Sequence, residues 1–356
     1  MKLCILGNGL TSLSLAKSLV KNGVFVDIFL NQRSFDINKS RTVGISKKNV
    51  DFYNNEVLNI EKFLWNINQI EVYSEKLNNE KVLNFENSDN ALFSMIKNFK
   101  LQEELLAKLK KNKFINFKKK KFNHKLDLDK YKLIINCDSD NSITKKFFYK
   151  RLKKKYNSFA HTTIIKHKKI KNNIASQIFT QKGPLAFLPL SETEASIVYS
   201  FKGNKNIDLK KLIEKYNFKY SIISFGKTAS FELKSSNLRS YHYKNILAFG
   251  DLLHRLHPLA GQGFNMTLRD INVLCELIKL RLNCGLELDQ SIFHDFEKKT
   301  RHKNYIFSSG IDFVYEFFNF ENKIKNNILS KSIQLIGKNK FLNKSFEKIA
   351  NNGLNI

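Results

Sequence analysis

The amino-acid sequence predicts an α/β protein in which a parallel-sheet domain is interrupted by a β-rich domain. Near the N-terminus, residues 2–30 show an apolar run, a glycine turn, apolar residues at helical spacing and a run of β-formers, which together predict a βαβ unit. Residues 245–249 predict another buried strand, and residues 265–282 a long helix of the same domain. Strand signals dominate the region between them, at 162–165, 176–180, 186–190, 195–201 and 228–233.

Because the parallel-sheet elements flank the β-rich region, we predict a discontinuous first domain. It takes three segments, residues 1–60, 97–158 and 236–285, and includes an amphipathic helix at 101–109 and a buried strand at 131–136. The predicted β-rich domain takes residues 61–96 and 159–235. Residues 286–356 are predicted to form a helical, strongly cationic C-terminal region.

Composition narrows the classes of function. The chain has 356 residues, 42% of them hydrophobic, so two packed domains can form. Its formal net charge of +29 would ordinarily favour nucleic acid or an anionic membrane as a partner. Only eight of the 61 basic residues are arginine, however, and the lysines accompany abundant asparagine and isoleucine, as an AT-rich genome produces. No nucleic-acid-binding module accompanies the charge, so we do not expect nucleic acid as a partner.

A glycine turn joins the first predicted strand to the first predicted helix. Gly7 allows a tight turn, and Gly9 lets the backbone approach a pyrophosphate at the positive end of the helix. The third position of this fingerprint is Ser12, a small residue in place of glycine. At the end of the second strand, where an acidic residue would bind ribose, the sequence has Leu30 followed by Asn31. The turn predicts dinucleotide binding without the usual ribose carboxylate.

The most specific pattern is residues 246–270. A carboxylate after a buried strand, Asp251, is suited to hydrogen-bond the hydroxyls of a cofactor chain that passes close to Gly250. Further on, residues 261–263 place bare backbone N–H groups at the start of a long helix, where negative charge is stabilised. The segment resembles the second FAD fingerprint of the flavoprotein aromatic hydroxylases of the p-hydroxybenzoate hydroxylase type, in particular those of ubiquinone biosynthesis. The matching residues are Gly250, Asp251, His254, His257, Pro258, Ala260, Gly261, Gln262, Gly263, Asn265, Arg269 and Asp270.

Three further segments resemble the same family. Residues 40–46 are similar to the loop whose arginine, here Arg41, reaches the cofactor. Residues 133–142 are similar to the Asp-Gly fingerprint, with Asp138 and Ser142 retained, Ser139 in place of glycine, and Lys145 where an arginine is usual. Residues 183–190 are similar to the substrate-domain strand of the ubiquinone hydroxylases.

The resemblance implies an FAD-binding Rossmann-like domain with an inserted β-sheet substrate domain. It implies an FAD-dependent monooxygenase that uses O2, through a hydroperoxide on the reduced flavin, to hydroxylate the ring of a polyprenylated phenol in ubiquinone biosynthesis. Electrons would come from NAD(P)H or a protein carrier. The flavin-ring environment would be Pro258, Gly261, Gln262 and Gly263. Other cofactor-binding residues would be Gly7, Gly9, Ser12, Asn31, Arg41, Asp138, Gly250, Asp251 and Asn265, and Phe187 and Pro189 would contact substrate.

No metal site is expected, and His254 and His257 are assigned packing roles because they lack a third ligand. No stretch of about 20 uncharged apolar residues occurs and there is no basic leader, so we expect a soluble, non-exported protein. Since a polyprenylated substrate is nearly insoluble, we expect a cytoplasmic protein that is peripheral at the inner membrane face or within a biosynthetic complex. Candidate contacts are two lysine-rich stretches and a group of phenylalanines: 109–121, 145–155, Phe313, Phe317, Phe318 and Phe320.

Two alternatives remain open on the sequence. A degenerate family member could serve as a non-catalytic component of a ubiquinone-biosynthesis complex, because Ser12, Leu30, Ser139 and Lys145 all depart from the FAD pattern. A flavin-dependent isoprenoid reductase would share the cofactor fold, although residues 183–190 argue against it. The sequence does not specify the ring carbon, the prenyl length or the oligomeric state.

Overall fold

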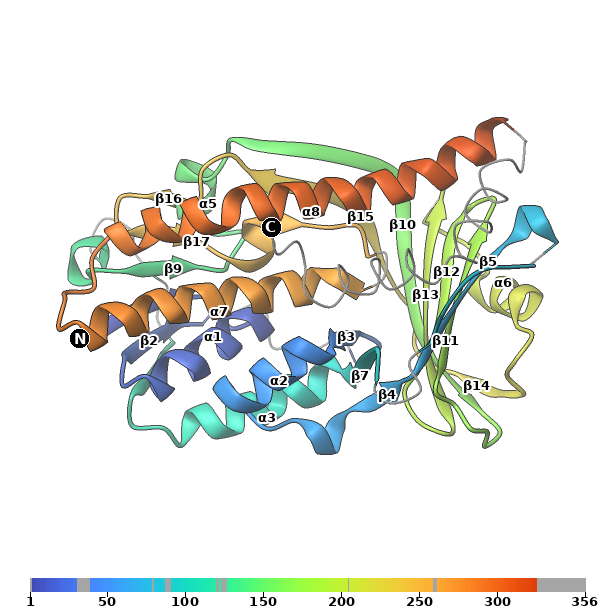
Figure 1. Cartoon of the computed structure of the whole chain (residues 1–356), viewed down its shortest axis with the longest axis horizontal. Helices are drawn as coiled ribbons and strands as arrows, with labels where there is room; N and C mark the ends of the chain where they lie inside the picture. The colour runs from blue at the N-terminus through green and yellow to red at the C-terminus, as the bar shows by residue number, and fades with distance from the viewer. Residues whose placement is uncertain are drawn as a thin grey trace.

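The computed structural model describes residues 2–30, 39–78, 80–86, 91–119, 122, 127–203, 205–258 and 261–324. Figure 1 shows two lobes, a helix-covered sheet on the left and a tall, curved sheet on the right. The long helix α8 (Ser291–Ile324) runs along both. Among the described helices, none combines the length and the apolar character needed to cross a lipid bilayer.

The first lobe is built on a six-stranded sheet in the order β16-β17-β9-β1-β2-β8. All neighbours pair in parallel except β16, which is antiparallel to β17. The strands come from three distant parts of the chain: β1 (Lys2–Leu6), β2 (Phe25–Phe29), β8 (Ile115–Lys118), β9 (Ile134–Asn136), β16 (His242–Tyr243) and β17 (Ile246–Ala248). Its central strands read as apolar runs because helices bury both faces of a parallel sheet.

The helices of this lobe pack their apolar faces into one core with the sheet. They are α1 (Leu10–Lys21), α2 (Lys47–Glu56), α3 (Asn98–Lys110), α5 (Ser142–Phe147) and α7 (Gln262–Asn283). In Figure 1, α7 and α8 run side by side in opposite directions, joined by a turn at the left end. The helix of the βαβ unit predicted over residues 2–30 is therefore present, as are the helices predicted at 101–109 and 265–282, whose ends are shifted by one to three residues.

The second lobe is a nine-stranded sheet, β18-β15-β10-β13-β12-β11-β5-β6, with β14 also pairing to β10. All pairs are antiparallel except β11 with β5. Its strands are β5 (Gln69–Ser74), β6 (Glu80–Glu86), β10 (Arg151–His167), β11 (Ile174–Thr180), β12 (Gly183–Pro189), β13 (Glu194–Lys202), β14 (Ile222–Phe225), β15 (Ala229–Leu238) and β18 (His254–Arg255). One face is covered by α6 (Leu209–Tyr216).

A three-stranded sheet, β3-β7-β4, lies where the lobes meet. It is formed by β3 (Thr42–Ser46), β4 (Trp65–Ile67) and β7 (Phe93–Lys97). The predicted fold class, an α/β domain with an inserted β-sheet domain and following helix, is confirmed. The strands of the six-stranded sheet come from all three segments assigned to the first domain, but β18, in the third of these segments, joins the nine-stranded sheet. Of the predicted helical C-terminal region, residues 325–356 lie outside the described residues.

Candidate active site

The predicted cofactor residues meet at the carboxyl ends of β1, β9 and β17. In the register of the sheet, Leu6 pairs with Asn136, and Asn136 pairs with Ala248. The turns after all three strands therefore lie at one edge. Because the chain leaves β1 for β2 on one side while β9 pairs on the other, this edge is a switch point of the topology, where nucleotides bind in open α/β sheets.

The turn at Gly7 has the geometry that a phosphate-binding loop needs. Gly7 has φ +108°, and a Cβ there would lie 3.2 Å from the Ser12 hydroxyl. Ser12 is buried, so it fills the close-packed position that the third glycine usually takes. Gly9 begins α1 without any side-chain cap, and a Cβ added to it would meet no protein atom within 4 Å. The first turn of α1 therefore presents N–H groups to open space.

The turn after β17 contacts the same helix. Gly250 has φ +65°, and a Cβ there would lie 2.7 Å from the methyl group of Thr11. Asp251, the next residue, is exposed at this edge. Burial raises the pKa of the Cys137 thiol, and the carboxylates of Asp138 and Asp251 raise it further, which places both carboxylates near the end of β9.

Asp138 also holds its own turn together. Its Oδ1 accepts a hydrogen bond from the Asp140 N–H at 2.9 Å, and its carbonyl accepts one from Thr144 at 2.7 Å. Asn141 caps α5 by accepting from the Thr144 N–H at 2.8 Å. In this turn Ser139 is exposed, so the replacement of the usual glycine leaves a folded loop.

The N-terminus of α7 is fixed against β3. Gly261 precedes the helix with φ +62°, and a Cβ there would lie 3.9 Å from the Gly44 nitrogen. Asn265 is buried and joins the two elements: its Oδ1 accepts from the Ser46 N–H at 2.8 Å, and its Nδ2 donates to the Gly44 carbonyl at 2.9 Å. Asn265, predicted to bind cofactor, thus has a positioning role for the turn. Gly263, like Gly9, faces open space.

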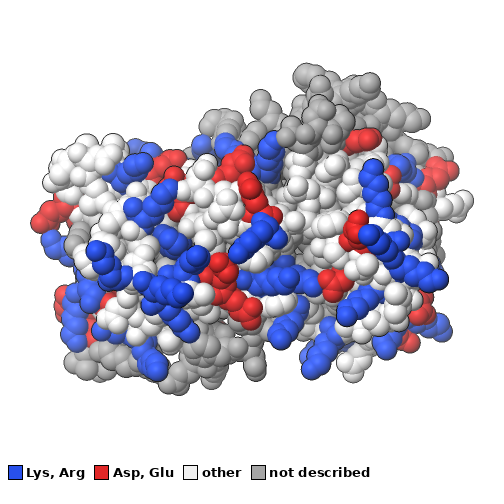
Figure 2. Space-filling view, turned by 90° about the horizontal axis from the view of Figure 1, so that it is seen from below, with Lys and Arg blue, Asp and Glu red and all other residues white. Residues whose placement is uncertain are grey.

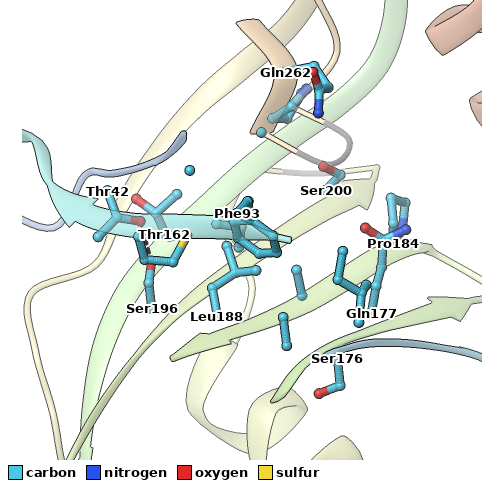
Figure 3. A pocket seen from close by; sticks show the side chains of 18 of the residues that line it. Thr42, Phe93, Thr162, Ser176, Gln177, Pro184, Leu188, Ser196, Ser200 and Gln262 are labelled. Atoms are coloured by element: carbon cyan, nitrogen blue, oxygen red, sulfur yellow. Dashed lines mark hydrogen bonds between the residues drawn. The ribbon is translucent and has the colours of Figure 1, made fainter. Parts of the chain in front are cut away.

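A cavity of about 350 Å³ opens on this turn. One of its walls is the face of the nine-stranded sheet that points away from α6, and β3 and β7 complete it. In Figure 3, Thr42, Thr162 and Ser196 lie together on one side, Gln177 and Pro184 on the other, and Gln262 of α7 beyond them. The lining residues are Ser40, Arg41, Thr42, Gly44, Ser46, Ile70, Val72, Phe85, Leu92, Phe93, Met95, Thr162, Ala175, Ser176, Gln177, Pro184, Ala186, Leu188, Ser196, Val198, Ser200, Phe231, Pro258, Gly261, Gln262 and Asn265.

The structure corrects the choice of residues on β12. Side chains alternate along a strand, and Pro184, Ala186 and Leu188 face the cavity. Phe187 points to the opposite face, where it is 2% exposed and packs in the core with α6. Pro189 is also buried and does not line the cavity. The predicted substrate-domain strand is therefore at the site, but with its even-numbered residues in contact.

The cavity wall carries hydroxyl and amide groups and one charge. The Thr42 hydroxyl donates to the Ser196 Oγ at 2.9 Å. Arg41, predicted to reach the cofactor, supplies the one charged side chain among the described lining residues, and its guanidinium lies 5.8 Å from the ring centroid of Phe231. Such walls suit a ligand that is mostly apolar and uncharged, with a few groups able to hydrogen-bond.

The two histidines of the motif are buried beside the site. The Nε2 of His254 lies 2.5 Å from the Oδ2 of Asp270, so this pair joins β18 to α7. His257 packs against the rings of both Tyr156 and Tyr315, with centroid distances of 4.9 and 4.3 Å, and the two tyrosine rings also contact each other. These contacts match the packing roles assigned to both side chains.

The residues present fit FAD. The N-termini of α1 and α7 both lack side-chain caps. A Cβ added at Gly9 or Gly263 would meet no protein atom within 4 Å, so there is open space at both helix ends. The amide oxygen of Gln262 is buried at the cavity and has no hydrogen-bond partner among the described residues, which leaves an acceptor for a bound ring system. Of the predicted cofactor residues, Asn31 lies outside the described residues. Leu30, which precedes it and departs from the FAD pattern, packs partly buried against the core of the first lobe.

Several cavity residues were not predicted from the sequence. They lie on strands that are distant in the chain: Ile70 and Val72 on β5, Phe85 on β6, and Phe93 and Met95 on β7. Residues 58–96 gave only mixed short signals, and nothing local indicates that β5 pairs with β11 in parallel. Only the pairing brings these side chains to the site.

Comparison with solved structures places the fold among the FAD-dependent monooxygenases. The p-nitrophenol 4-monooxygenase of Pseudomonas putida superposes with a TM-score of 0.79 at 11% identity, covering 99% of this chain and 98% of that one. Klebsiella pneumoniae HpxO, solved with FAD and uric acid, gives a TM-score of 0.76 at 12% identity and covers 99% and 98%. No protein-family model matches the chain.

The sequence relatives reported below are named as a ubiquinone biosynthesis monooxygenase and a demethoxyubiquinol hydroxylase, so the resemblance seen in the motifs is confirmed. The ubiquinone biosynthesis monooxygenase COQ6 of Schizosaccharomyces pombe is 22% identical over 276 residues, 63% of this chain and 57% of that protein. The 3-demethoxyubiquinol 3-hydroxylase of Escherichia coli is 27% identical over 152 residues, 40% of this chain and 39% of that protein. The chain thus spans about half the length of the relatives it matches.

Proposed function

We propose that this chain is an FAD-dependent monooxygenase that hydroxylates the aromatic ring of a polyprenylated phenol in ubiquinone biosynthesis. The observation that carries the proposal is the cavity of about 350 Å³, with largely apolar walls, that opens directly on the turn before α7. The sequence relatives and the monooxygenase fold support the same reaction class.

The cavity walls suit a neutral phenol. Thr42 and Ser196 hold hydroxyl groups at the cavity surface, where a phenolic hydroxyl can exchange hydrogen bonds with them. At the nine-stranded sheet, the side chains of Ile70, Val72 and Phe85 provide an apolar wall for the first part of a prenyl tail.

Reduced FAD, when bound, supplies the activation of molecular oxygen that ring hydroxylation requires. The residues of the chain hold the cofactor and the substrate in place and shield them from water. The N–H groups at the start of α7 favour negative charge next to Gly261 and Gln262. Pro258, Leu188 and Met95 exclude water from the space beside this turn, which limits wasteful loss of reduced oxygen species.

The direct test supplies the purified, FAD-loaded protein with a chemical reductant, 18O2 and a short-tailed prenylphenol. We expect a hydroxylated product that carries one 18O atom, detected by mass spectrometry, and no product when FAD is omitted. NADH, NADPH and a reduced protein carrier are then compared as electron donors. A protein that binds FAD and consumes oxygen without hydroxylating any prenylphenol would contradict the proposal.

The second candidate is a non-catalytic component of a biosynthetic complex, favoured by the Leu30 and Ser139 departures from the FAD pattern. Titration with FAD separates the two, because a scaffold has no need to retain the cofactor. If the protein does not bind FAD even when FAD is in excess, the non-catalytic role is favoured over the monooxygenase. Binding with turnover supports the monooxygenase.

We also propose that the protein is peripheral at the inner membrane face. Phe313 of α8 is 68% exposed, and Tyr149 and Leu152 are exposed in the lysine-rich stretch 145–155. Lys154 pairs with Glu316 at 3.1 Å, which places the start of β10 beside α8. These groups form a mixed apolar and basic surface of the kind that binds lipid headgroups.

The other residues predicted to contact the membrane give weaker support for a membrane-binding surface. Phe317 packs partly buried against Val72 and Phe179, whereas Phe320 is exposed. The side chain of Phe318 and residues 120–121 lie outside the described residues. Figure 2 shows lysine and arginine spread over one face with acidic side chains between them, so this face has no patch of a single sign.

Vesicle binding tests the location. Binding to anionic vesicles should fall steeply with added salt, because exposed charges are screened over about 8 Å at physiological ionic strength. Phe313→Ser should weaken it, whereas Phe218→Ser, at a residue that is 58% exposed near α6, should not. If the wild-type protein ignores anionic vesicles at low salt, the substrate must be delivered by a partner protein.

A further inference from the structure

A second cavity lies between α2, α7 and α8 and shares no lining residue with the candidate active site. Its volume is about 940 Å³. α7 and α8 run antiparallel side by side (Figure 1), and side chains of these two helices and of α2 line the cavity, which we call the groove. Nothing in the reaction proposed above uses this groove.

Basic side chains dominate the groove. Five lysine or arginine side chains and one histidine line it: Lys48, Arg269, Lys298, Lys299, Lys303 and His302. None of the six makes an ion pair with a carboxylate of the described residues, although ion pairs occur at many other lysines of the chain. Three carboxylates line the groove as well, so its five lysine and arginine side chains leave a moderate excess of positive charge in a concave site.

Each of the three carboxylates of the groove has a polar partner of its own. Asp270 lies 2.5 Å from the His254 ring and accepts from Asn304 at 3.0 Å. Glu276 accepts from Asn272 at 2.7 Å. The third carboxylate, Asp295, lies 3.5 Å from Arg281, outside the groove lining.

Arg269 is the cation of the groove whose charged group is buried and lacks a hydrogen-bond partner at one nitrogen. Its guanidinium stacks on the ring of Phe307, 4.6 Å from the centroid, and its Nη1 is buried with no hydrogen-bond partner in the described part of the chain. Burial lowers the pKa of Arg269 to about 10, which leaves it charged at neutral pH. The Asp270 carboxylate favours the charged form of Arg269, but the buried Nη1 group still lacks a hydrogen-bond partner, so an anion that reached this guanidinium would be bound through it.

We propose that this groove binds a phosphate group, carried either by a soluble phosphate compound or by a lipid headgroup. The planar fork of Arg269 can contact two phosphate oxygens, and the lysines of α8 supply point charges around them. Phe52, Val273 and Leu280 form an apolar wall beside the cations, which suits the organic part of a phosphate ester. The site is independent of the hydroxylation reaction and of the FAD site.

The competing explanation is that Arg269 simply joins α7 to α8 through its stack on Phe307. A purely structural arginine would lower stability when replaced but would leave phosphate binding unchanged. Because Lys298 and Lys299 are exposed on α8, their replacement tests the groove without disturbing the stack.

The experiment is calorimetric titration of the FAD-loaded protein with inorganic pyrophosphate at physiological ionic strength. We expect one site, with the dissociation constant raised at least about tenfold by Arg269→Gln and by the double variant Lys298→Gln/Lys299→Gln, as loss of charged hydrogen bonds predicts. The matched control is Lys279→Gln, an exposed lysine of α7 outside the groove, which should bind as the wild type does.

A second arm uses vesicles containing phosphatidate and identifies the source of the phosphate. If the groove variants lose vesicle binding relative to Lys279→Gln, a lipid headgroup is the ligand; if they lose only pyrophosphate binding, it is a soluble phosphate compound. The proposal is overturned if pyrophosphate and vesicles bind the groove variants and the Lys279→Gln control equally well.

Discussion

His257 makes the stability of the fold depend on pH in a window that the structure defines. The ring is buried against Tyr156 and Tyr315, and neither of its nitrogens has a hydrogen-bond partner among the described residues. Burial lowers its pKa from the usual 6.5 to about 3. Between these two values the unfolded chain binds more protons than the folded one, so stability falls as the pH falls.

The magnitude follows from the size of this window. Stabilisation by neutral His257 is complete above pH 6.5 and is lost progressively as the pH falls toward about 3. Each pH unit within the window corresponds to about 1.4 kcal/mol. At pH 5 the loss relative to neutral pH is therefore about 2 kcal/mol, a large part of the 5–15 kcal/mol that is typical of folded proteins.

The measurement compares urea unfolding of the wild type and His257→Phe at pH 7.5 and pH 5.0. Phenylalanine keeps a ring packed against the two tyrosines and cannot take up a proton, so the variant should lose about 2 kcal/mol less stability than the wild type over this range. His294→Phe, at an exposed position of α8, should keep the wild-type dependence. Equal pH dependence in the wild type and His257→Phe would refute the reasoning.

Four further substitutions test the site and its scaffold. Asp251→Ala should raise the FAD dissociation constant at least about tenfold in a fluorescence titration, because it removes charged hydrogen bonds, and an unchanged constant would exclude that role. Ala186→Phe should block the cavity and abolish hydroxylation while the FAD content stays normal. Phe187→Ala, on the opposite face of β12, should lower the free energy of unfolding by about 3–5 kcal/mol. Loss of hydroxylation in the Phe187 variant and loss of stability in the Ala186 variant would contradict the assignment of the two faces. Gly183→Ala should lower the melting temperature, because at φ +129° its Cβ would lie 2.0 Å from the Ser200 carbonyl oxygen; an unchanged melting temperature would show that the backbone relaxes.

The cofactor edge could be predicted from sequence because its signals are local. Gly7, Gly250 and Gly261 each adopt a positive φ in a turn that follows or precedes a recognisable element. Such turns require glycine for steric reasons, so spacing and residue type suffice to find them. The role of Asn265 was different, since its partners on β3 are about 220 residues away and only the folded chain brings them together.

The substrate cavity shows more clearly what cannot be predicted from sequence patterns. Alternation along β12 predicts a strand, but it does not say which face meets the cavity when both faces are covered. That choice depends on α6, whose Leu209 and Ile213 pack against Phe187. Because α6 follows β12 by about 20 residues and pairs with it only through the core, no local pattern assigns Ala186 to the site and Phe187 to the core.

The departures from the usual FAD pattern are unequal in their physical consequences. Ser12 is buried beside Gly7 and completes the close packing of that turn, so it preserves the phosphate-binding geometry. Leu30 instead packs against the core at the position where the pattern has a carboxylate. Charged hydrogen bonds to ribose are worth about 1.5–3 kcal/mol, so their loss corresponds to about ten- to a hundredfold weaker FAD binding. Retention of the cofactor therefore depends on the N-termini of α1 and α7 and on Asp251, and this dependence makes Asp251 more important here than in a protein that also has the ribose carboxylate.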